Sequence, residues 1–340
     1  MNRGMDDAEP IADFATTPPL LFARVLDGKG GARPAGWEEV QHWRPHDHEP
    51  VLWLHLDRTA PGVREWLADR FDIPAPTIEL LTSEATRPRA FHEGHALVAT
   101  LRGINFNPGA EPEDMVSMQL WANGHVVLTL RRRQLQTPKL VRDALDNGRG
   151  PVDAGGLVTT ITEHLIDRMS ETIIELNAEI DRLDDEECEL PASEVISAIA
   201  GIRRSCLALK RHMSPQHEAL ENIARDAPAW FERHDRRQIV ETIDRLRRFL
   251  DDIDISKESA LVLQDDMRAR AAAQTQQTQY LLTIVAGIFL PLTFITGLLG
   301  INVGDIPLAE AGSHGFWIIV AICGGIFGAE LLIARKLKWF

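Results

Sequence analysis

Residues Tyr280–Gly300 read YLLTIVAGIFLPLTFITGLLG, a run of 21 residues without a charged side chain. A second run, Phe316–Ala334, reads FWIIVAICGGIFGAELLIA over 19 residues and contains one charge, Glu330. As helices rising about 1.5 Å per residue, the runs would span roughly 31 and 28 Å, about the thickness of a bilayer core. The alternative is a buried hairpin of a soluble protein, but such helices rarely extend this far without polar residues. The two runs therefore predict two membrane-spanning helices.

The charges around these runs predict their orientation. Five cations lie before the first run or after the second, whereas the connection 301–315 has neither lysine nor arginine. The five are Arg268, Arg270, Arg335, Lys336 and Lys338. Because cytoplasmic flanks carry the excess of lysine and arginine, both termini are expected in the cytoplasm. The N-terminal MNRGMDDAEP resembles no signal peptide, so we expect a multi-pass protein of the inner (plasma) membrane.

The composition excludes several function classes. Among the 340 residues, 36 Lys and Arg stand against 50 Asp and Glu, and the net charge of −14 argues against nucleic-acid binding. The three cysteines form no CxxC pair, and no glycine-rich phosphate loop or nucleophile elbow occurs. We therefore expect neither an enzyme nor a resident cofactor.

Residues 1–155 are predicted to form a cytoplasmic α/β domain. Short apolar or alternating runs, separated by turn residues such as Asn123-Gly124, indicate strands. The expected strands lie in Pro50–Asp57, Ala96–Ile104, Met115–Trp121 and His125–Leu130, and the expected helices are Val63–Arg70 and Thr77–Thr82.

Residues 156–279 are predicted to be a helical region that leads into the membrane domain, 280–340. Apolar residues at steps of three and four predict one long helix from Val158 to Leu183, and a second helix should follow Pro191. Because Trp230–Ala286 contains no Gly or Pro, we expect one continuous stalk helix that becomes the first membrane span. Its heptad-like stripe is expected to drive association of several copies. The stripe consists of Ile239, Ile243, Leu246, Leu250 and Ile253.

One face of the first span is smaller and more polar than the other. Helical spacing from Gln279 gives Thr283, Ala286, Leu290, Thr293 and Gly297, opposite Ile284, Ile288, Phe289, Leu292 and Ile295. A pore surface has this character, although small residues also favour close helix packing. The polar stretch Ala271–Gln279 fits either a water-filled passage or a solvated collar. Two spans cannot enclose a polar path without exposing polar groups to lipid, so transport would require an oligomer.

The stretch Gly287–Asn302, GIFLPLTFITGLLGIN, resembles the first membrane span of the CorA superfamily of divalent-cation transporters, which carries a Gly-Met-Asn signature at its outer end. This chain has Gly300-Ile301-Asn302 there. That variant, with SALVLQ at Ser259–Gln264, is similar to the ZntB branch, which is associated with zinc. The resemblance covers nearly the whole chain. It implies an α+β cytoplasmic domain, a long stalk helix and two C-terminal transmembrane helices in a funnel-shaped homopentamer.

The resemblance also implies a site, in which five Asn302 side chains form the filter and the cation-binding ring. Neutral amide oxygens suit weak contact with a hydrated ion, whereas tight zinc sites use Cys and His. The other expected pore residues are Gly300, Ile301, Thr293, Leu290, Gly297 and Gln279. Asp305 stands where a second glycine is expected, and five copies of it would add negative charge beside the entrance.

Weaker candidates lie in the cytoplasmic part. Asp265 and Asp266 are possible cation sites near the inner mouth of the pore. His42, His46 and His48 could bind metal, but their polar surroundings favour an exposed loop. We expect the chain to transport a divalent cation, most simply zinc, with the lipid bilayer and its own copies as partners. A magnesium, nickel or cobalt channel and a non-conducting membrane-anchored sensor or scaffold are the alternatives.

Overall fold

The computed structural model describes residues 18–44, 50–84, 86–185, 190–300 and 313–336. The chain divides into two compact units, Met1–Gln264 and Asp265–Phe340. The division falls inside a helix, and the predicted domain boundaries after residues 155 and 279 stay a prediction.

The first unit contains a mixed sheet whose described strands lie in the order β2-β1-β3-β7-β6-β5-β4. Their bounds are β1 Leu20–Leu26, β2 Ala32–Pro34, β3 Leu52–Asp57, β4 Arg89–Glu93, β5 Ala96–Gly103, β6 Val116–Ala122 and β7 Val126–Arg131. Strands β3 and β7 pair in parallel, and the other described pairs are antiparallel. All four strands expected from the sequence are therefore confirmed.

The Asn123-Gly124 turn joins β6 to β7 for a clear local reason. Gly124 has φ +94°, in the left-handed region that glycine adopts without a steric penalty. The Asn123 side chain accepts hydrogen bonds from the backbone N–H groups of His125 and Val126, at 3.1 and 2.9 Å. These contacts close the hairpin and bring the two strands into register.

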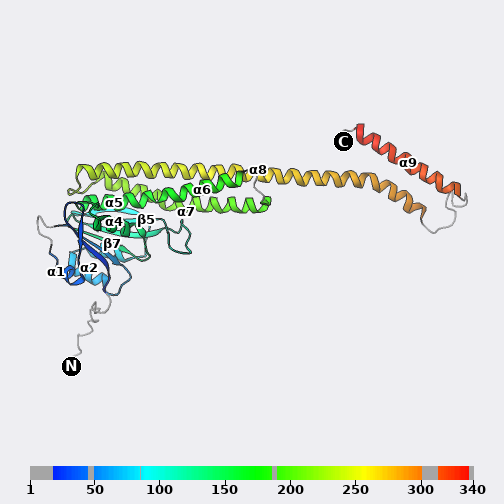
Figure 1. Ribbon diagram of the computed structural model, residues 1–340. Helices are drawn as coiled ribbons and strands as arrows, with labels where there is room; N and C mark the ends of the chain where they lie inside the picture. The colour runs from blue at the N-terminus through cyan, green and yellow to red at the C-terminus, as the bar shows by residue number, and fades with distance from the viewer. Residues whose placement is uncertain (1–17, 45–49, 85, 186–189, 301–312, 337–340) are drawn as a thin grey trace, which may run out of the picture. The chain divides into compact units, whose positions relative to one another are not determined.

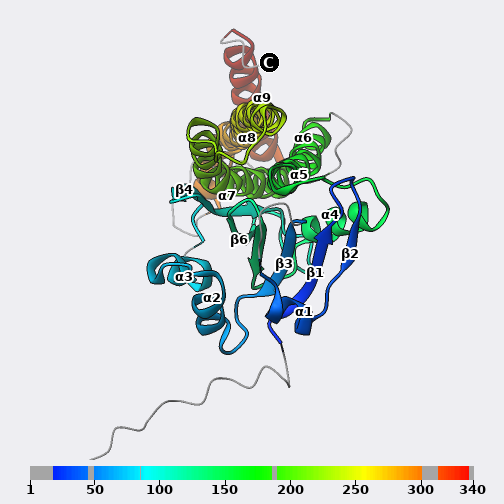
Figure 2. The same ribbon diagram turned by 90° about the vertical axis from the view of Figure 1, so that its left-hand side faces the viewer.

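Helices cover both faces of the sheet (Figure 2). Helices α1 Trp37–His42, α2 Val63–Phe71 and α3 Ala75–Thr82 enclose one core with Leu54, Leu128 and Trp121 of the sheet. On the other face lie α5 Ala154–Asp167 and α7 Ala192–Arg225, while α4 Gln136–Asp146 lies beside β2. The two expected helices of this domain, now α2 and α3, are confirmed.

The helix expected from Val158 to Leu183 is two helices, α5 and α6 Met169–Asp184, so that prediction was wrong in one detail. They meet at Arg168. Just beyond it, the Ser170 hydroxyl donates to the Asp167 carbonyl at 2.7 Å, a side-chain bond that competes with the regular helical ladder. Apolar spacing continues across such a break, so the periodicity could not reveal it.

The continuous stalk helix is confirmed as α8 Arg233–Leu299, 67 residues long. Its first part runs beside α5, α6 and α7 (Figure 1), and polar pairs join them. Thr159 donates to Gln238 at 2.9 Å, and Lys210 donates to Asp254 at 2.7 Å.

The expected role of the heptad-like stripe was wrong. Ile239, Leu246 and Ile253 are buried within the single chain, and Ile243 and Leu250 are half-buried. A heptad pattern does not distinguish a partner helix of the same chain from one of another copy. Here Ile239, Leu246 and Ile253 pack inside the chain's own bundle, so these three side chains are not free to contact another copy.

Candidate cation path in the membrane segment

The C-terminal unit presents two apolar helices with little cover of their own. Both α8 and α9 Ser313–Lys336 contain a stretch long and apolar enough to cross a membrane. Only 6% of that stretch in α8 and 0% of the stretch in α9 is buried. A core hairpin of a soluble protein would be mostly buried. The exposed apolar surface therefore needs lipid or further copies of the chain to cover it.

The two faces of the membrane part of α8 differ in exposure. Ile284 is buried, and Ile288, Leu292 and Ile295 are half-buried, at the spacing of one helical face. The expected pore residues lie on the other side and are exposed; they are Gln279, Thr283, Ala286, Leu290, Thr293 and Gly297. The small and polar stripe is thus open in a single chain, as are apolar residues beside it such as Leu282 and Phe289.

Threonine hydroxyls on this segment are prepared to accept rather than donate. Thr283 donates its proton to Gln279 O at 2.8 Å, Thr293 to Phe289 O at 2.7 Å, and Thr296 to Leu292 O at 3.0 Å. Each hydroxyl proton is therefore used within the helix, and the oxygen lone pairs remain for an external donor or cation. Water or a hydrated cation passing along this face would meet these hydroxyl oxygens as acceptors.

Thr296 was missed in the sequence analysis. It lies three residues after Thr293, about one helical turn further along α8. Thr275 and Thr278 bond in the same way to Ala271 O and Gln274 O, both at 3.0 Å. The repeated threonines at helical spacing were the available signal.

Helix α8 ends at Leu299, and Gly300 closes it with its N–H directed to Thr296 O and Gly297 O, both at 3.1 Å. Gly300 is exposed. Ile301, Asn302 and Asp305, the expected filter and entrance residues, lie outside the described residues. Their roles stay predictions.

The acidic pair before the membrane is engaged in salt bridges along its own helix. Arg268 lies 3.6 Å from the Asp265 carboxylate, and Arg270 lies 2.7 Å from that of Asp266. All four side chains are exposed, and such pairs contribute only about 0–1 kcal/mol each, so a divalent cation could compete for them. A cation site at these residues stays a prediction.

Histidine clusters give no metal site in the described part of the chain, where no group of three or more His, Cys, Asp or Glu residues could hold an ion. The His42 ring lies 2.8 Å from the Glu38 carbonyl through its Nδ1 atom. His46 and His48 lie outside the described residues.

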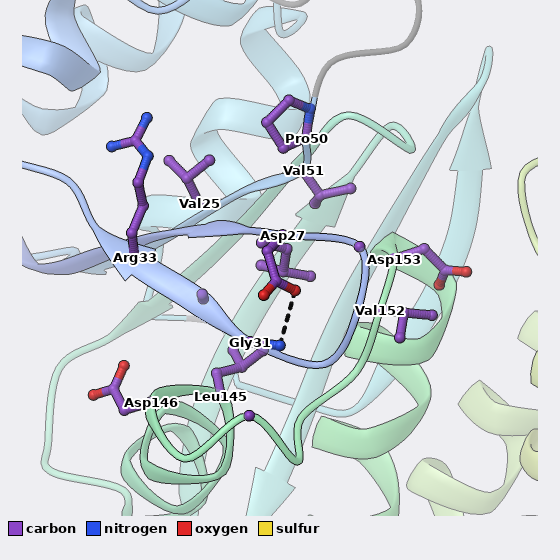
Figure 3. Close-up of a pocket in the computed structure, with 14 residues that line it drawn as sticks. Val25, Asp27, Gly31, Arg33, Pro50, Val51, Leu145, Asp146, Val152 and Asp153 are labelled. Atoms are coloured by element: carbon purple, nitrogen blue, oxygen red, sulfur yellow. Dashed lines mark hydrogen bonds between the residues drawn. The ribbon is translucent and has the colours of Figure 1, made fainter.

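A pocket of about 880 Å³ beside β1 and β2 contains three carboxylates (Figure 3). Asp27 accepts hydrogen bonds from Lys29 N and Gly31 N, which lower its pKa. Asp146 pairs with Arg24 at 2.7 Å, and Asp153 caps α5 by accepting from Gly156 N at 2.7 Å. Each carboxylate thus has a structural partner, and the pocket offers no free acidic set for a cation.

These observations define the class of protein: a membrane protein with an α+β body, a long helix that becomes the first span, and a second span near the C-terminus. Residues 48–336 match the family described as "CorA-like Mg2+ transporter protein". The chain belongs to this family. Its relatives are transporters and not enzymes.

Individual relatives cover nearly the whole chain. The chain is 36% identical over 322 residues to the "Divalent cation transporter CmaX" of Pseudomonas aeruginosa, covering 94% of this chain and 96% of that protein. It is 34% identical over 321 residues to the "Zinc transport protein ZntB" of Pectobacterium atrosepticum, covering 94% and 95%. The structure of full-length CmaX superimposes with a TM-score of 0.81 at 35% identity, over 94% of this chain and 98% of that one.

Proposed function

We propose that this chain forms a homopentameric pore that passes divalent cations, zinc first, across the inner membrane. The observation that carries the proposal is the exposed stripe from Gln279 to Gly297 on an otherwise apolar helix. A water-filled path shared by several copies would give these oxygens and the Gln279 amide partners that lipid does not offer. The cation is cargo in this proposal and not a resident cofactor.

The selectivity of the pore is assigned to the end of the stripe. Five Asn302 amides would form the filter just beyond Gly300, and Ile301 would lie between Gly300 and Asn302. Asp305 would concentrate cations at the outer entrance. Leu290 would set the width between the polar rings of Gln279 and Thr293, and Gly297 would set it between Thr293 and the filter. On the cytoplasmic side, Asp265 and Asp266 would hold cations once their arginine partners are displaced.

The assembly needs a surface other than the buried stripe of α8. Ile255 and Val262 are both 64% exposed on α8, although they are apolar. They precede Thr283 by multiples of seven residues, so they lie in heptad register with the pore stripe. A helix that meets its own copies along one face would have this pattern, and we assign contacts between copies to these two residues.

The orientation follows from the flanking charges. Arg268 and Arg270 precede the first span, and Arg335 and Lys336 end the second, so both termini are assigned to the cytoplasm. The connection between the spans faces outward. The Asn302 ring then meets ions arriving from outside.

The choice of ion rests on the relatives' names, which point in two directions. One relative is named for zinc and another for divalent cations in general, while the family description names Mg2+. A magnesium channel is therefore the second candidate. The sensor or scaffold alternative has no relative in its favour among these.

The test is ion flux through purified protein in liposomes. Zinc, magnesium, nickel and cobalt are compared at equal concentration, with and without a pH gradient, and empty liposomes serve as the control. Saturable flux with zinc ahead supports the proposal, and faster magnesium would select the second candidate. Flux no greater than in empty liposomes would contradict a pore.

A further inference from the structure

A second pocket, of about 410 Å³, lies at one end of the sheet in the cytoplasmic unit. Strands β3 and β7 are parallel, and β5 runs in the same direction because both β5 and β7 are antiparallel to β6. Arg58 follows β3, Arg132 and Arg133 follow β7, and Arg102 lies at the end of β5. The pocket is thus at the carboxyl ends of three strands, where open α/β sheets commonly bind ligands.

The lining of this pocket is positively charged in an acidic chain. Four arginines face two carboxylates, Glu84 and Asp114, and His212 of α7 completes the wall. One carboxylate is already used, because Arg132 donates to Glu84 at 2.8 Å. The pocket therefore holds more cationic than anionic groups, although the whole chain has a net charge of −14.

Arg58 is the most deeply placed of the four, with 7% of its surface exposed. Its Nη1 atom donates to Ser83 O, and the buried Gln119 amide, oriented to donate to Leu130 O, accepts from the same atom at 3.2 Å. Its Nε atom has no hydrogen-bond partner among the described residues. A buried guanidinium with an unsatisfied donor is costly unless an acceptor reaches it. Burial and nearby Arg132 lower the pKa of Arg58, as expected where positive charges outnumber their partners.

Arg102 is fixed firmly in the wall. Its Nε atom donates to Thr86 O and its Nη1 to Met115 O, both at 2.8 Å, and Nη1 also lies 3.3 Å from His212 Nε2. Burial, with Arg102 and Arg211 nearby, lowers the pKa of His212 to about 4. The ring is therefore neutral near pH 7 and accepts from Arg102, which leaves the arginine charge in place.

Arg133 lies at the rim of the pocket, where its side chain is free to change conformation. It is exposed, and its side chain has no hydrogen bond or ion pair among the described residues. A long, uncommitted guanidinium at the rim can close on a ligand that the buried arginines attract. Its planar fork matches two oxygens of one oxyanion better than it matches a monatomic anion.

We propose that this pocket binds a phosphate group, carried either by inorganic phosphate or by a small nucleotide. The guanidinium groups of Arg58 and Arg133 contact the phosphate oxygens, while Arg102 and Arg132 hold the charge of the site. The inference concerns the cytoplasmic unit alone and does not depend on whether the chain conducts cations.

Calorimetric titration of the full-length protein in detergent tests the proposal. Inorganic phosphate and AMP are titrated separately, at constant ionic strength set with chloride. We expect saturable binding at one site per chain, and the tighter of the two ligands identifies the source of the phosphate group. Arg133→Ala should weaken binding by about tenfold, the effect of one charge-assisted contact, and Arg133→Lys should fall in between.

The matched control is Arg149→Ala, which removes the same charge from an exposed position outside this pocket. It should bind phosphate as the wild type does. Equal weakening in the two alanine variants would reduce the effect to diffuse electrostatics and overturn the site. Absence of saturable binding by the wild type of both inorganic phosphate and AMP at millimolar concentration would also overturn it, whatever the flux assay shows.

Discussion

At the scale of single residues, the proposed filter depends on one amide per chain. In the proposed pentamer, Asn302→Ala would remove five acceptors from a single ring. At roughly 0.5–1 kcal/mol per lost contact, the barrier to entry rises by several kcal/mol, so divalent flux should fall many-fold. Thr293→Ala should retain a substantial part of the flux, because water can replace one hydroxyl per chain. Both are measured in liposomes containing equal amounts of protein.

The Asn302→Ala protein must first be shown to assemble as the wild type does and to melt at nearly the same temperature. Full transport by such a protein would mean that Asn302 does not form the filter.

His55 lies at the centre of a buried polar group. The Thr129 hydroxyl donates to Leu54 O at 3.1 Å, so it must accept from Trp53 Nε1 and from His55 Nδ1, both at 2.9 Å. His55 therefore carries a proton on Nδ1. Burial, with Arg131 and Arg142 nearby, lowers its pKa to about 3.

This lowered pKa predicts acid sensitivity of the cytoplasmic unit. An unfolded histidine binds a proton below pH about 6.5, whereas folded His55 stays neutral down to pH about 3, so protons favour unfolding across that window. The contribution of His55 is complete above pH about 6.5 and decreases by up to about 1.4 kcal/mol per pH unit below it. The measurement is the unfolding midpoint from pH 7 to 5, followed by tryptophan fluorescence. His55→Gln should flatten this dependence and exposed His42→Gln should not; equal slopes would contradict the assignment.

At the scale of secondary-structure elements, the start of α8 is tightly packed against α5. Asp235, in the first turn of α8, is buried and accepts from Glu232 N at 2.8 Å. A Cβ atom at Gly155 of α5 would overlap the Asp235 carboxylate. The close approach of the two helices thus requires glycine at this position.

Gly155→Ala should therefore destabilise the cytoplasmic unit by about 1–3 kcal/mol, the usual cost of overpacking. Gly201→Ala is the matched control: the same change inside α7, where an added Cβ has ordinary contacts only, should be neutral or stabilising. The free energies of unfolding of the two variants are compared by chemical denaturation. If Gly155→Ala were as stable as Gly201→Ala, the helices would not be in close contact there.

The exposed apolar residues of α8 should act on assembly and not on folding. Replacing Ile255 and Val262 together by Asp should dissociate the oligomer in detergent, because charges would face each other between copies. Val240 is another exposed apolar residue of α8, but it is one position out of heptad register with Ile255 and Val262. Val240→Asp should therefore leave the oligomer intact. Size-exclusion chromatography with light scattering compares the variants. An intact oligomer in the double variant would move the interface elsewhere.

The sequence predicted the long elements better than the short ones. The strands with clear apolar runs and the uninterrupted α8 were predictable, because their periodicity extends over many residues. Strand β2, with three residues, and helix α1, with six, are too short to show a period. The α5–α6 break depends on one side-chain bond of Ser170, which no pattern reveals.

The candidate sites divide in the same way. The pore stripe was predictable because its residues follow one helix at regular spacing. The arginine pocket was not, because Arg58, Arg102 and Arg132 are far apart in the sequence and meet only through the pairing of β3, β5, β6 and β7. The partner of the Ile239–Ile253 stripe likewise depended on tertiary packing.

At the scale of the whole molecule, two spans per chain cannot surround water. The polar stripe of α8 is open in a single chain, and an aqueous path shared by several copies would hydrate its acceptor groups. A pore therefore requires that several copies of the chain assemble.

The most direct measurement of this claim is the mass of the intact assembly, obtained by native mass spectrometry of protein released from detergent. The account predicts a single species near five times 38.0 kDa that persists at low protein concentration. A clean monomer or dimer in mild detergent, active or not, would contradict it, because neither could enclose the polar stripe.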